Sequence, residues 1–128
     1  GPNIGNNRGP KTILISTDSL RKSVRFQRAR LRGRGIIIVD AVRIGSQAEQ
    51  LGLKPGQILV ALSDPIQGND VVWPIEDNTS LRFIMDAIRV TTCRTTVIQV
   101  EDPDPSQPAP IPESNSRDYR AAVGPQGG

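Results

Sequence analysis

The densest group of charged side chains in this 128-residue chain is a basic run between positions 21 and 34. It holds seven basic residues and no acidic one: Arg21, Lys22, Arg25, Arg28, Arg30, Arg32 and Arg34. Such a strip attracts anions, so it could bind an acidic protein segment, an anionic lipid surface or a nucleic acid. It could equally be a solvated strand margin, because arginine on an edge strand discourages aggregation. Phe26 is the only aromatic residue in the run, so nucleic acid is the weaker alternative.

The other polar side chains give little support for catalysis or for metal binding. The chain has no histidine, so the usual base for a serine or cysteine nucleophile is missing. Its one cysteine, Cys93, allows neither an intrachain disulfide nor a zinc cluster. The acidic residues between 64 and 77 do not have the spacing of a calcium-binding EF-hand loop. We therefore predict a protein with no enzymatic activity, no cofactor and no metal.

Composition indicates one small, strand-rich domain. Hydrophobic residues make up 36% of the chain and aromatic residues 3%, so the core must consist mainly of Ile, Leu and Val, which favour strands. Residues 1–100 carry 14 basic and 8 acidic side chains (+6), whereas residues 101–128 carry 2 and 5 (−3). The folded part is therefore basic and the C-terminal part acidic. No apolar run reaches the roughly 18 residues that predict a membrane span.

Hydrophobic periodicity places the basic run on a strand. Alternation or continuous apolar character predicts strands at 11–17, 23–31, 35–42, 57–63 and 95–101. Helices are predicted at 47–51 and 80–90, each preceded by a suitable N-cap. We expect 18–22 to be a connection and 64–79 to be a loop with a short edge strand. This order predicts an α+β fold, a small partly open antiparallel β-barrel or sandwich of five to six strands capped by two helices.

The two ends of the chain differ in composition from its centre. The opening Gly1-Pro2 resembles the scar of a protease cleavage, and residues 1–10 lack any periodicity, so we expect a disordered N-terminal segment. We place the domain at 11–102. The Pro- and Gly-rich residues 103–128 are expected to form a disordered linker or tail.

One stretch of the chain resembles a known family. The segment VDAVRIGSQAEQLGLKPGQILVAL at 39–62 is similar to PDZ domains, in which a Gly-Ser turn, a short helix and a second Gly turn precede an apolar strand. The resemblance extends over 11–102. It implies a non-catalytic protein-interaction module that adds the extended C-terminus of a partner beside the second strand, opposite the second predicted helix, 80–90.

The resemblance also implies the residues of a peptide site. The family's carboxylate-binding Gly-Leu-Gly-Phe loop falls on residues 23–26, which depart from it at three of four positions. Arg21 and Lys22, just before the loop, could supply compensating charge. Arg28 would favour acidic ligands, and the helix residues either line the groove or belong to the core. The expected peptide-binding residues are Ser23, Val24, Arg25, Phe26, Arg28, Leu81, Met85 and Ile88.

A second likeness concerns GNDVVWPIEDNTSLRFIMDAI at 68–88. The elongated connection with its Trp-Pro pair is similar to PDZ domains of plant and algal plastid proteins that assist photosystem assembly at thylakoids. It implies a scaffold or assembly factor of a photosynthetic membrane complex, in the plastid stroma or at the thylakoid surface. Two other hypotheses stay open, the regulatory PDZ domain of a serine protease and a basic surface for acidic lipid or nucleic acid.

For the partner, the sequence favours a protein or peptide C-terminus of apolar or acidic character, bound by a monomer with some peripheral membrane association. The last residues, 117–128, either form a plain linker or fold back over the peptide groove, where tethering would raise their effective concentration.

Overall fold

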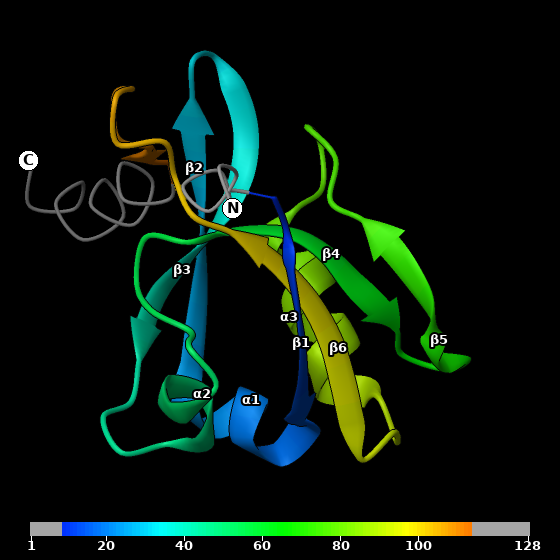
Figure 1. Cartoon of the computed structure of the whole chain (residues 1–128). Coiled ribbons are helices and arrows are strands. Elements are labelled where there is room, and N and C mark those ends of the chain that lie inside the picture. Colours follow the sequence, from blue (N-terminus) through cyan, green and yellow to red (C-terminus); the bar gives the residue numbers. More distant parts are fainter. Residues whose placement is uncertain (1–8, 114–128) are drawn as a thin grey trace, which may run out of the picture.

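A computed structural model describes residues 9–113 of the chain. The strands are β1 (Lys11–Ser16), β2 (Val24–Leu31), β3 (Arg34–Val42), β4 (Ile58–Asp64), β5 (Gly68–Pro74), β6 (Thr95–Glu101) and β7 (Ile111–Pro112). The helices are α1 (Thr17–Ser23), α2 (Gln47–Gln50) and α3 (Leu81–Val90). All strand pairs are antiparallel and form one curved sheet in the order β1-β6-β4-β3-β2-β7, with β5 paired to β4 (Figure 1). The predicted α+β class and its PDZ-like arrangement are confirmed.

The core lies inside the curved sheet and beneath α3. Alternation along β2 places Val24 and Phe26 in the interior, while Arg25 between them faces solvent. From α3, Ile84, Ala87 and Ile88 are buried against the sheet. Ile84 is therefore a core residue, which was one of the two alternatives for the apolar positions of this helix.

The predicted turns around α2 are found. The Ser46 side chain accepts a hydrogen bond from the Glu49 N–H at 3.2 Å, so it caps the first turn. Gly52 ends the helix with a φ of 98°, a conformation that side chains with a Cβ rarely adopt. The chain then returns to bury Leu53 before β4 begins. These two turns direct α2 back over the end of the sheet (Figure 1).

Two expected connections have more structure than predicted. Residues 18–22, expected to be a connection, belong to α1, because the Ser16 side chain accepts from the Ser19 N–H and Leu20 is buried in the core. The edge strand expected within 64–79 extends to seven residues as β5. Leu20 is the one apolar residue of the DSLRK segment, so hydrophobic periodicity could not reveal α1.

The Pro-rich segment after β6 returns to the sheet. Its residues Ile111 and Pro112 form β7, which pairs with Arg30 and Ala29 of β2 (Figure 1). Proline-rich chains favour extended conformations, so this composition is compatible with a short edge strand. The other segments predicted to be disordered, 1–8 and 114–128, lie outside the described residues.

Candidate peptide-binding site

An apolar pocket lies between the start of β2 and the C-terminal half of α3. It has a volume of about 320 Å³ and is lined by Leu20, Arg21, Val24, Phe26, Met85, Ile88 and Arg89. Four of the residues expected to bind peptide therefore lie together, two from β2 and two from α3. Phe26 is 3% exposed and forms part of the core, whereas Met85 is 44% exposed, so a ligand can reach the Met85 side of the pocket.

Sequence reasoning missed Leu20 and Arg89 as lining residues of this pocket. Leu20 lies on α1, where only a connection was expected. A signal for α1 was present, because Ser16 precedes Asp18 in the first turn and two basic residues in the last turn, a charge order that suits the helix dipole. Leu81, expected at the groove, instead packs partly buried against the core cluster in the first turn of α3.

Arg21 holds the pocket together at the end of α3. Its guanidinium donates to the carbonyl oxygens of Ile88 (2.9 Å), Arg89 (3.2 Å) and Thr91 (2.8 Å). These carbonyls lie at a helix C-terminus, where backbone acceptors lack partners within the helix and a positive charge is favoured. Arg21 therefore joins α1 to α3 beside the pocket.

The residues that match the carboxylate loop do not form an open loop. Ser23 is the last residue of α1, and the Val24 N–H donates to the Leu20 carbonyl oxygen as the helix cap. The Phe26 backbone is more suitable for a ligand. The Arg28 carbonyl oxygen accepts from the N–H of Glu113, on the side of β2 away from β3. Alternate residues of an antiparallel strand direct their N–H and C=O groups to the same side. Phe26 therefore presents its backbone groups at the β2 edge.

A basic hollow of about 490 Å³ adjoins the pocket at the start of β2. The basic side chains in its lining are Arg21, Lys22, Arg25 and Arg43, and Ser23 and Met85 also contribute. Lys22 pairs with Asp18 (3.1 Å) and Arg25 with Asp40 (2.9 Å), but each pair has at least one side chain that is about 70% exposed, so these pairs are weak and exchangeable. Arg43, which sequence reasoning did not select, places a further cation at this hollow.

Arg28 closes the opposite end of the groove. One guanidinium nitrogen donates to the carbonyl oxygens of Asp77 (3.1 Å) and Thr79 (2.7 Å), just before α3. Its Nε donates to Glu113 at 3.1 Å. The guanidinium lies against Gly35, where a Cβ would come within 2.3 Å of an Arg28 nitrogen. Arg28 thus links β2 with the segment before α3.

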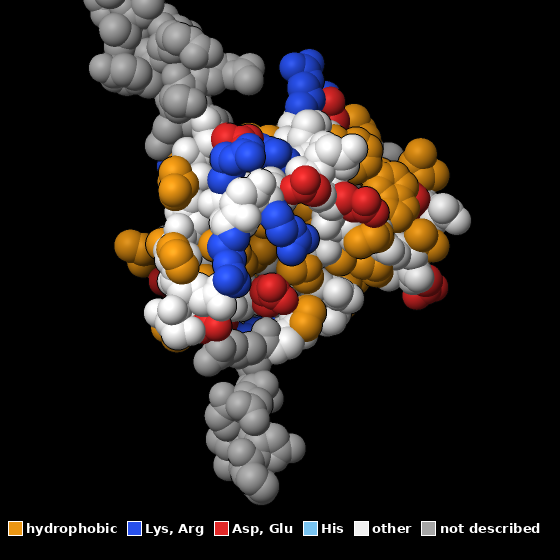
Figure 2. All heavy atoms as spheres, turned by 90° about the horizontal axis from the view of Figure 1, so that it is seen from above, with side chains coloured by type: hydrophobic (Ala, Val, Ile, Leu, Met, Phe, Trp, Pro, Cys, Tyr) orange, Lys and Arg blue, Asp and Glu red, His pale blue; other side chains and the backbone are white. Residues whose placement is uncertain are grey.

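The rest of the basic run lies near the β2–β3 hairpin. Arg30 pairs with Glu113 at 2.8 Å, and Arg32 donates to Gln107 at 2.5 Å. Seen from above, Lys and Arg side chains gather on this face with Asp and Glu side chains beside them (Figure 2). Glu113, which is far away in the sequence, therefore pairs with two arginines of the run.

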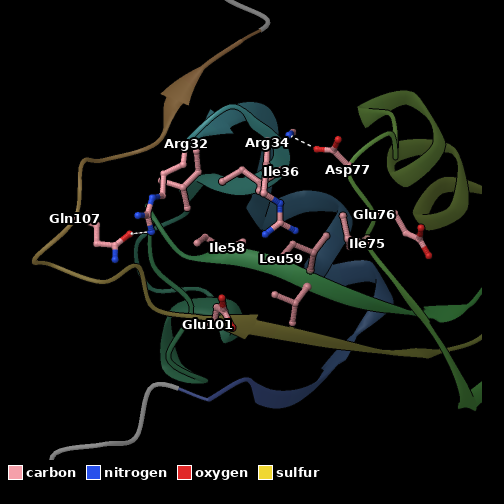
Figure 3. Close-up of a pocket in the computed structure, with 13 residues that line it drawn as sticks. Arg32, Arg34, Ile36, Ile58, Leu59, Ile75, Glu76, Asp77, Glu101 and Gln107 are labelled. Carbon is pink, nitrogen blue, oxygen red and sulfur yellow. Dashed lines mark hydrogen bonds between the residues drawn. The ribbon is translucent and has the colours of Figure 1, made fainter.

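Arg34 belongs to a separate pocket of about 240 Å³ beneath the hairpin. Ile36, Ile58 and Leu59 form its apolar floor, and Glu76 and Asp77 lie on its rim (Figure 3). The Asp77 carboxylate accepts from the Gly35 N–H, which ties the segment before α3 to β3. This pocket is distinct from the groove between β2 and α3.

Within residues 9–113, no group of three or more His, Cys, Asp or Glu side chains could hold a metal ion. Asp64 accepts hydrogen bonds from the N–H groups of Gln67 (2.8 Å) and Ile66 (2.7 Å), which lower the pKa of its carboxyl and close a turn. Cys93 is a free thiol, half-buried near the Pro65 carbonyl oxygen. No helix in the described part of the chain is long and apolar enough to cross a bilayer.

The curved antiparallel sheet, its short helix between two glycine turns and the groove between β2 and α3 define a PDZ-like fold. Comparison with solved structures agrees: the chain is similar to the crystal structure of the second PDZ domain of Dlg1 from the choanoflagellate Monosiga brevicollis. The TM-score is 0.54 at 21% sequence identity, covering 73% of this chain and 92% of that one. No protein-family model and no curated protein matches the sequence. The likeness therefore establishes the fold.

Proposed function

We propose that this chain is a non-catalytic protein-interaction module that binds the extended C-terminus of a partner. The ligand would add as a strand to the β2 edge at Val24–Phe26 and place its last side chain in the pocket beside Met85. The observation that carries the proposal is the apolar pocket between the β2 strand edge and α3. The PDZ-like fold of the chain is consistent with this use.

We propose further that side chains, not a glycine loop, recognise the terminal carboxylate. The Val24 N–H already donates within the helix cap, which removes one amide from the expected set. The adjoining hollow supplies an ammonium group from Lys22 and a guanidinium group from Arg43, beside the Arg21 guanidinium that is bonded to the end of α3. A carboxylate bound there forms charge-assisted hydrogen bonds, which are stronger than neutral ones. Amidating the C-terminus of a bound peptide should therefore weaken binding.

The test is an NMR titration with a library of peptides that carry free C-termini. We expect shifts at Val24, Phe26, Met85 and Ile88, and we expect Met85→Lys to weaken binding about tenfold or more, because an ammonium group would have to be desolvated in an apolar pocket. Leu14→Lys is the matched control, since Leu14 is also exposed but lies on β1, away from the pocket. Equal binding by both variants would exclude this groove as the site.

A basic surface for acidic lipid or nucleic acid is a second candidate, favoured by the hollow at Arg21, Lys22, Arg25 and Arg43. The affinity of such binding would fall steeply as the salt concentration rises and would not depend on peptide sequence.

A scaffold or assembly role in a photosynthetic complex, or regulation of a serine protease, would use the groove between β2 and α3. The Trp73-Pro74 pair that suggested plastid proteins lies on β5, where Trp73 stacks on Phe83 (centroids 5.5 Å apart) and so has a structural role.

A further inference from the structure

The short strand β7 occupies part of the edge that a ligand would use. A peptide whose C-terminus lies at the start of β2 must run antiparallel to β2, from the Leu31 end towards Val24. β7 runs in that direction, with Ile111 opposite Arg30 and Pro112 opposite Ala29. The next residue, Glu113, donates its N–H to the Arg28 carbonyl oxygen at 2.9 Å. We call residues 111–113 the latch segment.

The Glu113 side chain is the main attachment of the latch segment. One carboxylate oxygen accepts from Arg28 Nε at 3.1 Å and the other from an Arg30 nitrogen at 2.8 Å. The Arg28 side chain is only 19% exposed and that of Glu113 30%, so solvent screens the Arg28 pair less than an exposed one. These hydrogen bonds, first from Arg30 and then from Arg28, hold the pKa of Glu113 below its usual value.

The remainder of the latch segment is weakly held. β7 has two residues, and Ile111 is 68% exposed, so its side chain buries little apolar surface. Two ladder pairs alone do not form a stable strand in water. The Glu113 carboxylate at the two arginines is therefore the strongest of these contacts, and a carboxylate from another chain could replace it.

We propose that the latch segment is an internal competitor for the upstream part of the ligand, and that the natural partner is an acidic peptide. Its carboxylate side chain would take the place of Glu113 at Arg28 and Arg30, about four residues before its C-terminus. This inference rests on the proposed function of the groove. Because the latch segment is tethered after β6, its effective concentration is high, on the order of millimolar. A partner without the acidic residue would leave the latch in place and pair only with Val24–Phe26.

The first experiment needs no ligand. By strand alternation the Arg30 N–H faces β7, so its hydrogen-exchange protection reports latch closure. We expect Glu113→Gln in the full chain to lower the Arg30 protection factor about tenfold. Glu76→Gln is the matched control, because it removes one negative charge from an exposed position outside the groove. Unchanged Arg30 protection in Glu113→Gln would overturn the latch.

The second experiment tests whether a ligand competes with the latch segment. It measures the affinity of two fluorescein-labelled peptides, GAPEATAV and GAPQATAV, which differ only at the fifth residue from the C-terminus. In Glu113→Gln we expect the Glu probe to bind about five- to tenfold tighter than the Gln probe, and tighter than it binds Glu76→Gln. Equal affinity of the two probes in Glu113→Gln would refute the acidic-partner assignment. Failure of both probes to shift Val24, Phe26 and Met85 in any variant would instead count against the proposed function, while the exchange experiment still decides whether the latch exists.

Discussion

Replacing Phe26 by alanine is expected to lower the free energy of unfolding by about 3–5 kcal/mol. The side chain is 3% exposed and packs in the main core cluster, so its loss leaves a cavity in addition to the lost transfer free energy. A domain of this size has roughly 5–15 kcal/mol of stability in total, so the loss is a large fraction of it. Urea unfolding followed by circular dichroism measures the change.

The chain contains a matched control for this substitution. Phe83, the other phenylalanine, is 46% exposed and stacks on Trp73 across the α3–β5 surface. Phe83→Ala should cost about 0.5–1.5 kcal/mol, the value of one aromatic pair. If the two alanine variants lose equal stability, β2 does not have the register described, since that register places Phe26 inside.

Replacing Gly35 by alanine is expected to destabilise the fold by about 1–3 kcal/mol, the usual cost of overpacking. The added Cβ would lie 2.3 Å from an Arg28 nitrogen and 2.5 Å from the Asp77 carbonyl oxygen. Arg28 can move, but the Asp77 oxygen belongs to the backbone before α3. The variant should therefore release Arg28 from Asp77 and Thr79 and loosen the far end of the groove. Thermal unfolding measures the loss.

Two further variants make the Gly35 prediction specific. Gly9→Ala is the control, because nothing lies within 4 Å of its Cβ position. In an Arg28→Ala background, Gly35→Ala should cost less than in the native chain, since one of the two clashes is gone and contacting residues are not additive. Full additivity of the two substitutions would show that Arg28 does not lie against Gly35.

In the structure, most members of the basic run have acidic or backbone partners. In sequence it is seven cations without an acid, but Asp18, Asp40 and Glu113 come from outside the run to pair with its members. Arg21 and Arg28 donate to backbone carbonyls at the two ends of α3. The run therefore both joins β2 to α3 and leaves a cationic hollow at the start of β2.

Local chemistry was sufficient to predict most of the fold. Apolar alternation and runs placed five strands, serine caps and a glycine turn placed α2 and α3, and the order of these elements indicated an α+β barrel or sandwich. The PDZ-like class came from the resemblance of residues 39–62. Val24, Phe26, Met85 and Ile88 could be assigned to one groove because the resemblance supplied the pairing of β2 with α3. The strand, cap and turn signals depend on residues that are neighbours in the chain, whereas the pairing of β2 with α3 came only from the resemblance.

The tertiary structure decided what depends on residues far apart in sequence. The alternation of β2 does not indicate that Arg28 reaches Thr79, or that Glu113 returns across 85 positions to join it. Proline-rich composition likewise predicts an extended chain without saying where it lies. Charge partners are chosen by distance in the folded chain, and that distance exists only once the sheet has brought β2, α3 and the C-terminal segment together.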